Sequence, residues 1–231
     1  MAIRSYFVPK SNYPFYSEID IHFDFHKGFS ISQQQKSIKS MHNAILTKSN
    51  NYKILEISTK SIQPYGLNLS AFRLPIRYKS RDCILESVYQ SCKLFEFGGP
   101  YSDLAFMDAL NAKNDLRLKS SGPLINFYFD SNLWPLLPSP NFYDFLYISA
   151  FLENFKIDGL LEFNVFTDFA YSTTAKSNKK FGSFNCQARS AAIIVGLSSL
   201  LPVHEIKEFV KNLAKDGTRF VEKREITLFD N

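Results

Sequence analysis

Three side chains that could take part in acid–base chemistry lie on one face of a helix predicted over residues 84–97. Glu86, Gln90 and Lys93 fall within about 60° of one another on a helical wheel, opposite the apolar residues of that segment. Glu86 and Lys93 are two turns apart, roughly 10 Å along the axis, which excludes a direct ion pair. The face therefore offers a carboxylate, an amide and an ammonium group in a row. A solvated helix face is the alternative interpretation.

Three further positions carry side chains that could bind a ligand. Asp168 stands among aromatic and aliphatic residues in FNVFTDFAY, so its carboxylate must be paired or functional, unless it caps a turn. Trp134 lies beside a proline-rich loop and could stack on a base or a sugar, or pack in the core. Asn185 and Arg189 open a predicted helix whose free N–H groups suit a phosphate. An ordinary helix cap with a surface arginine is the alternative there.

Two carboxylates and a lysine suit the cleavage of a glycosidic bond. Breaking a bond between ribose C1 and a nitrogen builds positive charge at C1 and leaves an amine that needs a proton. Glu86 and Asp168 are the candidate carboxylates for stabilising that charge or supplying that proton. A desolvated lysine could instead attack C1 and form a Schiff base, and the residues alone leave open which lysine that is. No Walker, GxGxxG, HExxH or GxSxG motif and no metal-ligand spacing is present, so we expect neither a cofactor nor a metal.

The composition is that of a globular enzyme-sized domain with a basic surface. The 231 residues carry a net charge of +5, which favours polyanionic partners only weakly because lysine and arginine are dispersed. Three cysteines without ligand spacing indicate a reducing compartment. The N-terminus lacks a signal-like apolar stretch, and no apolar run approaches the roughly 18 residues that a membrane span requires. We therefore predict a cytoplasmic protein with no membrane partner.

Hydrophobic periodicity predicts a predominantly helical α+β fold with a few short strands. A strand is expected around residues 18–23, and a helix over 30–48 that buries Ile31, Ile38, Met41, Ile45 and Leu46 and turns Lys36 away from that stripe. We treat residues 1–231 as a single domain. The remaining predicted elements are a strand at 52–58, an extended segment or strand pair at 67–79, helices at 84–97, 103–120, 141–154 and 187–201, a further helix from 202, a polar loop at 172–184 and a weak edge strand after 217.

The order of several short motifs resembles the NADAR/YbiA superfamily over about residues 54–200. The resemblance rests on LSAF at 69–72, on LESVYQ at 85–90 followed by KLF at 93–95, and then on Trp134, an aromatic helix, Asp168 and the Asn185 segment. The chain is more similar still to the DarT-associated NADAR antitoxin branch. That likeness rests on QQQKSI at 33–38 with HN at 42–43, LEISTKS at 55–61, FEFGGPYSDL at 95–104 and NCQARSAA at 185–192.

This resemblance implies a YbiA-like fold and an ADP-ribosylglycosidase that removes ADP-ribose from guanine in nucleic acid. The substrate would be ADP-ribosylated guanine in DNA or a nucleotide, and a cognate DarT-like toxin is the implied partner. The implied catalytic residues are Glu86, Asp168 and, through the N-terminal motif of the branch, Lys36. The implied ADP-ribose- or base-binding residues are Ser70, Phe72, Gln90, Lys93, Gly99, Tyr101, Trp134, Asn185 and Arg189.

Two departures from the YbiA-like pattern separate this chain from that part of the superfamily. Ser87 stands where YbiA-like members have histidine, and Phe169-Ala170 replaces their aromatic-glycine pair. Both changes argue against the YbiA-type activity on a riboflavin-pathway intermediate. That N-glycosidase activity, and a non-catalytic module that binds ADP-ribose or a toxin, are the two alternatives to the predicted function.

Overall fold

Two eight-residue strands begin the chain in the computed structural model, which describes residues 1–136, 142–171 and 185–216. Strand β1 (Ala2–Pro9) pairs antiparallel with β2 (Tyr16–Phe23) along its whole length. On its other edge β1 pairs antiparallel with the short β9 (Val165–Thr167), and β9 pairs in parallel with β3 (Ile54–Glu56). The resulting sheet has the order β2-β1-β9-β3, so it joins the N-terminal region to a segment more than 100 residues later.

The chain divides into two compact units. Unit 1 consists of Met1–Ser70 and Phe155–Leu201, and unit 2 of Ala71–Asn154 and Pro202–Asn231. Together their described residues contain both helices and strands, with more residues in helices than in strands, which confirms the α+β fold class. The treatment of residues 1–231 as one domain stays a prediction.

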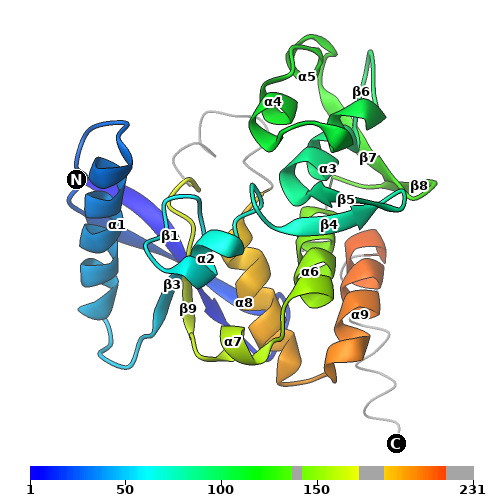
Figure 1. Cartoon of the computed structure of the whole chain (residues 1–231). Helices are drawn as coiled ribbons and strands as arrows, with labels where there is room; N and C mark the ends of the chain where they lie inside the picture. Colours follow the sequence, from blue (N-terminus) through cyan, green and yellow to red (C-terminus); the bar gives the residue numbers. More distant parts are fainter. Residues whose placement is uncertain (137–141, 172–184, 217–231) are drawn as a thin grey trace, which may run out of the picture. The chain divides into compact units, whose positions relative to one another are not determined.

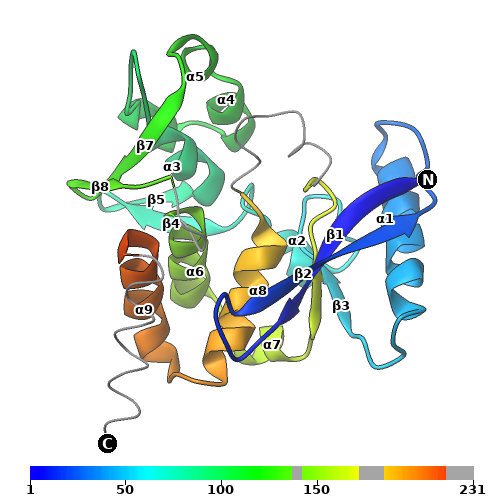
Figure 2. The same ribbon diagram turned by 180° about the vertical axis from the view of Figure 1, so that it is seen from behind.

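In unit 1, helices cover the two faces of the sheet (Figures 1 and 2). Side chains alternate along a strand, so Tyr6 and Phe7 point to opposite faces. Tyr6 belongs to the apolar cluster under α1 (Ile31–Leu46), while α8 (Gln187–Ser198) packs on β1 and β9. The unit also contains α2 (Pro64–Asn68) and α7 (Asp158–Leu161).

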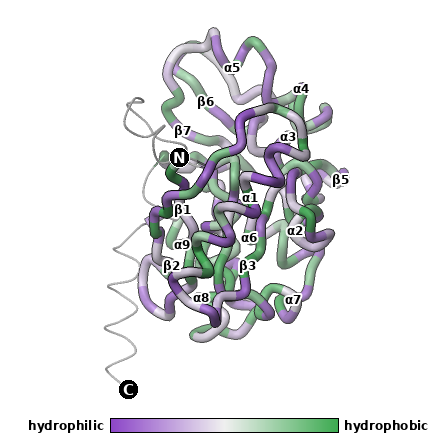
Figure 3. The backbone as a smooth tube through the Cα atoms, turned by 90° about the vertical axis from the view of Figure 1, so that its left-hand side faces the viewer, coloured by the Kyte–Doolittle hydropathy of each residue, from purple (hydrophilic) through white to green (hydrophobic). Residues whose placement is uncertain are grey.

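Helix α1 is amphipathic, as its sequence predicts, and Figure 3 shows hydrophilic and hydrophobic segments alternating along it. The Ser30 hydroxyl accepts a hydrogen bond from the Gln33 N–H and so caps the helix. Ile38, Met41 and Ile45 are buried as expected, and Lys36 is exposed. The prediction is wrong for Ile31 and Leu46, which are exposed. Ile31 lies nearly two turns before Ile38, the first residue of the helix in the apolar cluster, and Leu46 is rotated by about 100° from the buried Ile45.

Unit 2 is built around an aromatic core between strands and helices. Helix α6 (Phe142–Asn154), buried on nearly all sides as predicted, packs against α9 (Val203–Asp216) and α3 (Leu85–Ser91). The ring of Phe142 stacks on Phe127 at 4.8 Å between centroids. The other elements are β4 (Pro75–Tyr78), β5 (Arg81–Ile84), β6 (Lys93–Phe95), η1 (Ser102–Phe106), α4 (Ala109–Asn114), α5 (Arg117–Ser120), β7 (Leu124–Phe129) and β8 (Asn132–Trp134).

Several predicted elements are shorter or of another type than periodicity indicates. The helix predicted to reach residue 97 ends at Ser91, because β6 pairs with β7 and its backbone groups join that sheet. The predicted helix over 103–120 is divided into η1, α4 and α5, since the Asp108 carboxylate caps α4 and interrupts the earlier turn. Part of the segment 67–79, predicted as extended, is the end of α2, and Trp134 ends β8.

Three predictions fall wholly or partly outside the described residues. These are the polar loop at 172–184, the edge strand after residue 217, and the first residue of the helix predicted over 141–154.

Candidate functional site

Glu86, in the first turn of α3, is a buried carboxylate in unit 2, with 2% of its surface exposed. Its backbone N–H donates to the Ala71 carbonyl at 3.0 Å, which ties the start of the helix to the LSAF motif. Its Oε1 accepts a hydrogen bond from the Gln90 Nε2 at 2.9 Å and lies 3.3 Å from the Lys113 Nζ. The predicted Glu86–Gln90 pair is therefore formed, and the solvated-face alternative is wrong for these two buried residues.

Lys93 supplies a second ammonium group to this cluster. It lies in β6 rather than on α3, with its Nζ 5.1 Å from the centroid of the Tyr89 ring. Burial lowers the pKa of Lys93 to about 8, while the Glu86 carboxylate raises it and the Lys113 ammonium lowers it further. A lysine with this pKa is mostly protonated at neutral pH, yet it exchanges its proton far more readily than a surface lysine.

The Gln90 amide presents an acceptor in the same place. Its Nε2 donates to Glu86, whereas its buried Oε1 has no hydrogen-bond partner within the described part of the chain. A buried acceptor without a partner costs roughly 1–3 kcal/mol, so it favours a ligand that brings a donor. Glu86, Gln90, Lys93 and Lys113 thus combine a negative charge, two positive charges and an open acceptor.

Unit 1 contains two buried acidic residues, the predicted Asp168 and also Glu56. Asp168 is 4% exposed and accepts hydrogen bonds from the Gln187 Nε2 at 3.2 Å and the Ala170 N–H at 3.1 Å. Glu56, 2% exposed, accepts from the Phe169 N–H at 3.0 Å. Burial, and next the charge of Asp168, raise the pKa of Glu56 to about 7, against the opposing effect of its hydrogen bonds. One member of this acid pair therefore carries a proton near neutral pH.

A neutral histidine completes the network around Glu56. The Thr167 hydroxyl donates to the Glu56 Oε2 at 2.7 Å and lies 2.9 Å from the His42 Nε2. A hydroxyl has one proton to donate, so in this arrangement Thr167 accepts from an Nε2–H of His42. Burial lowers the pKa of His42 to about 4, which keeps the ring uncharged although the Glu56 Oε2 is 4.0 Å away.

Lys36, the predicted catalytic amine, lies elsewhere in unit 1. It is exposed on α1 and lines a hollow of about 600 Å³ together with Lys39, Asn43, His22 and His26. Within the described residues, no hydrogen bond or ion pair joins Lys36 to Asp168. Its role in catalysis stays a prediction.

Three other predicted binding residues lie in unit 2. Phe72 is close to the Glu86 cluster, because the Lys113 Nζ lies 4.9 Å from the centroid of its ring. The Tyr101 hydroxyl hydrogen bonds the Ser121 hydroxyl, and its ring lies under the Arg117 guanidinium. Gly99 has a φ of +83°, and a Cβ there would lie 2.5 Å from the Lys93 carbonyl oxygen, so the position requires glycine.

Trp134 is packed in the core of unit 2, the alternative that its sequence context left open. It is 2% exposed, and its ring stacks on Phe145 at 4.6 Å between centroids. Its indole N–H donates to the Phe129 carbonyl at 3.3 Å, and the Lys215 ammonium lies 5.0 Å from the ring centroid.

The remaining predicted residues belong to unit 1. Ser70 is buried at the end of the segment that leads into unit 2. Asn185 precedes α8 and is partly exposed, while Arg189 is buried within the first turns of that helix, so it is not a surface arginine. The structure therefore brings Glu86, Gln90, Lys93 and Phe72 together around Lys113, and places Asp168 beside the start of α8.

A comparison with protein families matches residues 2–223 to the DarT1-associated NADAR antitoxin family. The chain belongs to this family. A comparison with curated proteins found no match. The match extends over β1, β2 and α1 as well as α3, which carries Glu86, and the segment after β9, which carries Asp168, so the N-terminal motif is part of the family's domain.

Sequence reasoning on this NADAR antitoxin missed Lys113, Glu56 and His42. Lys113 stands in a charged helix where nothing local indicates that it reaches a buried carboxylate 27 positions earlier. Glu56 and His42 do occur in the motifs that carry the family resemblance, and Glu56 lies within a predicted buried strand. That apolar environment was the available signal that its carboxyl group has an unusual pKa.

The described residues contain neither a metal-binding cluster nor a helix that could span a membrane. No group of three histidine, cysteine, aspartate or glutamate side chains there is arranged to hold a metal ion. Among the helices of that part of the chain, none combines the length and the apolar character needed to span a bilayer. Cys83, Cys92 and Cys186 are all buried, and none of them forms a disulfide.

Because the pKa of Glu56 is raised in the folded protein, the free energy of unfolding should depend on pH, and Glu56→Gln should remove this dependence. The native state keeps a proton on Glu56 up to about pH 7, whereas the unfolded chain releases it near pH 4.5, so rising pH over this range destabilises the wild type. Relative to the wild type, Glu56→Gln should gain free energy of unfolding between pH 5 and pH 8, on the order of 3 kcal/mol. Urea denaturation followed by circular dichroism measures this difference.

The comparison of the two proteins isolates Glu56 from His42, whose lowered pKa destabilises the native state as pH falls from 6.5 to about 4. Glu162→Gln, at an exposed position of the same unit, is the control and should show no pH-dependent gain. The prediction is contradicted if Glu56→Gln and Glu162→Gln change the free energy of unfolding by the same amount at pH 5 and at pH 8.

Proposed function

We propose that this antitoxin is an ADP-ribosylglycosidase that hydrolyses the N-glycosidic bond between ADP-ribose and guanine in nucleic acid. The observation that supports the proposal most directly is the buried Glu86 carboxylate held between the Gln90 amide and the Lys113 ammonium, beside the desolvated Lys93. A carboxylate and a readily exchanging ammonium group are the two functions that cleavage at a sugar C1 requires.

In the proposed reaction, the bond between ribose C1 and the guanine nitrogen breaks and its electron pair goes to that nitrogen. The Lys93 ammonium donates the proton that the departing guanine needs, and the Glu86 carboxylate stabilises the positive charge at C1. Glu86 then takes a proton from the water whose oxygen bonds to C1. Transfer of that proton from Glu86 to Lys93 restores both groups, and the products are free ADP-ribose and unmodified guanine.

Lys36 and Asp168 have proposed roles that rest on the family motifs. Lys36 is the proposed amine of an alternative, covalent route. After it has lost a proton, its nitrogen would bond to C1 as guanine leaves, and the bond from C1 to the ring oxygen would then open as a proton passes from the nitrogen to that oxygen. Water would hydrolyse the resulting Schiff base. Asp168, which accepts hydrogen bonds from the Gln187 side chain and the Ala170 N–H, would accept hydrogen bonds from the sugar hydroxyls and so orient them. Removal of ADP-ribose from DNA would reverse the damage done by a DarT-like toxin, which is the proposed basis of the antitoxin role.

Replacing Glu86 by glutamine should abolish turnover. Glutamine keeps the shape of the side chain but can neither stabilise positive charge at C1 nor accept a proton from water, so the rate should fall by roughly 10²–10⁴-fold. The measurement is the release of ADP-ribose from an oligonucleotide that carries ADP-ribosylated guanine.

The matched control is Glu96→Gln, at an exposed position of the same unit, which should retain the wild-type rate. The proposal fails if the wild type releases no ADP-ribose, or if the Glu86→Gln protein is folded and as active as the control.

The proton-donating role of Lys93 predicts an alkaline limit to activity. The wild-type rate should fall as pH rises through about 8, by about tenfold per pH unit, because the neutral amine has no proton for guanine. Lys93→Arg should be slower but should lack this fall, since a guanidinium group stays protonated to pH 12 and above. Initial rates between pH 6 and pH 10 test both statements.

Lys119→Arg, at an exposed position of α5, is the control and should keep the wild-type pH profile. A wild-type rate that rises through pH 8 would show instead that the neutral amine is the active form, and would remove Lys93 from the donor role.

The Schiff base predicted for Lys36 can be trapped. Borohydride added during turnover reduces the imine to a stable amine, so the wild type should gain the mass of ADP-ribose on the peptide that contains Lys36. Lys36→Ala should yield no adduct, whereas Lys39→Ala, which alters the same helix and the same hollow, should still yield one. An adduct of unchanged mass and yield in Lys36→Ala would assign the amine to another lysine.

A further inference from the structure

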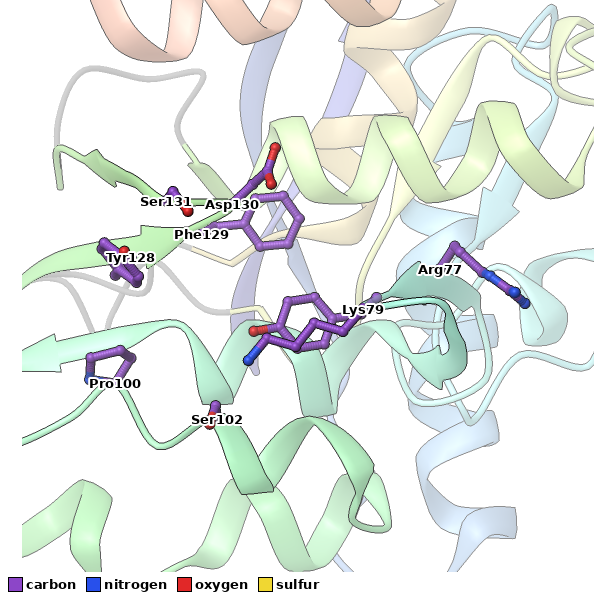
Figure 4. A pocket seen from close by; sticks show the side chains of 9 residues that line it. Arg77, Lys79, Pro100, Ser102, Tyr128, Phe129, Asp130 and Ser131 are labelled. Carbon is purple, nitrogen blue, oxygen red and sulfur yellow. The ribbon is translucent and has the colours of Figure 1, made fainter.

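A hollow of about 600 Å³ in unit 2 lies between two hairpin turns (Figure 4). One turn is Lys79-Ser80, between β4 and β5, and the other is Asp130-Ser131, between β7 and β8. All four residues have positive φ values, between 46° and 64°, as expected of the tight two-residue turns that suit the twist of a hairpin. These turns hold the walls of the hollow in place, and none of their residues has a role in the proposed reaction.

The hairpin β4–β5 carries cations that acids do not neutralise. Arg77 is paired with Asp82 at 2.8 Å, but Lys79 and Arg81 form no ion pair within the described residues. Each of the two instead lies on an aromatic ring, with the Lys79 Nζ 5.4 Å from the Tyr78 centroid and the Arg81 guanidinium 5.0 Å from the Phe106 centroid. Figure 4 shows Lys79 running into the hollow while Arg77 points away from the other labelled residues.

The rings beneath these cations form a continuous row. The Tyr78 ring lies 6.2 Å from Phe106 on one side and stacks on Phe129 at 5.8 Å on the other, with 24° between the planes. Phe106 is 45% exposed, and Tyr128, which also lines the hollow, is 41% exposed. We refer to Tyr78, Lys79, Arg81, Phe106, Tyr128 and Phe129 as the basic–aromatic strip.

We propose that the basic–aromatic strip binds single-stranded nucleic acid, and that it holds the strand next to the modified guanine. The second part follows from the packing of β4, β5 and η1, which carry Tyr78, Arg81 and Phe106, on α3, the helix of Glu86. Cations placed among accessible aromatic rings are the combination that binds single strands, since phosphates pair with the cations and unstacked bases stack on the rings. The hollow is large enough for one base, and Asp130, the carboxylate among the described residues that line it, can accept a hydrogen bond from an exocyclic amino group. Bases within a duplex keep their faces covered, so the strip selects single strands.

The identification of this strand with the substrate rests on the proposed function, whereas the binding of single strands does not. The first test therefore needs no enzymatic activity. Fluorescence anisotropy of a labelled 12-nucleotide single strand should show binding by the full chain that weakens as salt rises. The double variant Lys79→Glu/Arg81→Glu should weaken binding by tenfold or more.

The matched control is Lys119→Glu/Lys156→Glu, which lowers the net charge by the same amount at exposed positions outside the strip. Its affinity should stay within about threefold of the wild type, a small effect expected of net charge alone. Phe106→Ala, which keeps every charge, should also weaken binding, because stacking on a ring contributes roughly 1–3 kcal/mol per base. Equal losses in the two double variants, no binding by the wild type, or equal affinity for a duplex of the same sequence would overturn the proposal.

The second test links the strip to the substrate. Rates are compared on an ADP-ribosylated oligonucleotide and on ADP-ribosylated guanosine, which has no flanking strand. Lys79→Glu/Arg81→Glu should lose at least tenfold more activity on the oligonucleotide than on the nucleoside. Similar losses on both would contradict the placement of the strand. A wild type that is inactive on both substrates but still binds single strands through the strip would refute the proposed function and leave the binding site intact.

Discussion

The burial of one carboxylate constrains the arrangement of unit 2. A charged group with 2% of its surface exposed is stable in a protein only if cations and hydrogen-bond donors replace the water that it has lost. For Glu86, the Gln90 amide comes from the same helix, whereas the Lys113 ammonium comes from α4 and Lys93 from β6. Three separate elements must therefore meet at the first turn of α3, and the backbone bond from Glu86 to Ala71 adds the LSAF segment to them.

Glu86 and Glu56 are both buried carboxyl groups, and their surroundings stabilise them in different ways. In unit 2 the negative charge of Glu86 is balanced by ammonium groups, and burial lowers the pKa of Lys93 to about 8 although Glu86 raises it. In unit 1, burial and next the charge of Asp168 raise the pKa of Glu56 to about 7, and the hydrogen bonds that it accepts from uncharged groups only partly oppose this rise. One site thus keeps a charged carboxylate, and the other keeps a proton. Pairs of acids whose environments differ in this way are common where proton transfer is part of a reaction.

Local patterns predicted the elements whose character is set by their own residues. The amphipathic pattern of α1, the apolar surface of α6 and the spacing of Glu86 and Gln90 all depend on helical periodicity, and the structure shows each of them. The predictions were wrong where contacts with other segments of the chain determine the secondary structure. Residues 93–95 have a helical pattern, but pairing with β7 makes them a strand, and the Asp108 cap interrupts a segment that looks continuous. β9 was not predicted because both of its partners, β1 and β3, lie more than 100 residues away in the sequence, and β1 was not predicted although its main partner β2 follows it directly.

By itself, the sequence determined which family this chain belongs to, since ordered motifs over residues 2–223 need no coordinates to be matched. It also determined that Glu86 and Gln90 share one side of a helix, because that relation follows from 3.6 residues per turn. Only the tertiary structure decided which of the many lysines lose their water, that Glu56 carries a proton, and that Lys79 and Arg81 lie on aromatic rings. Desolvation and ion pairing depend on side chains from distant segments, and no local pattern contains that information.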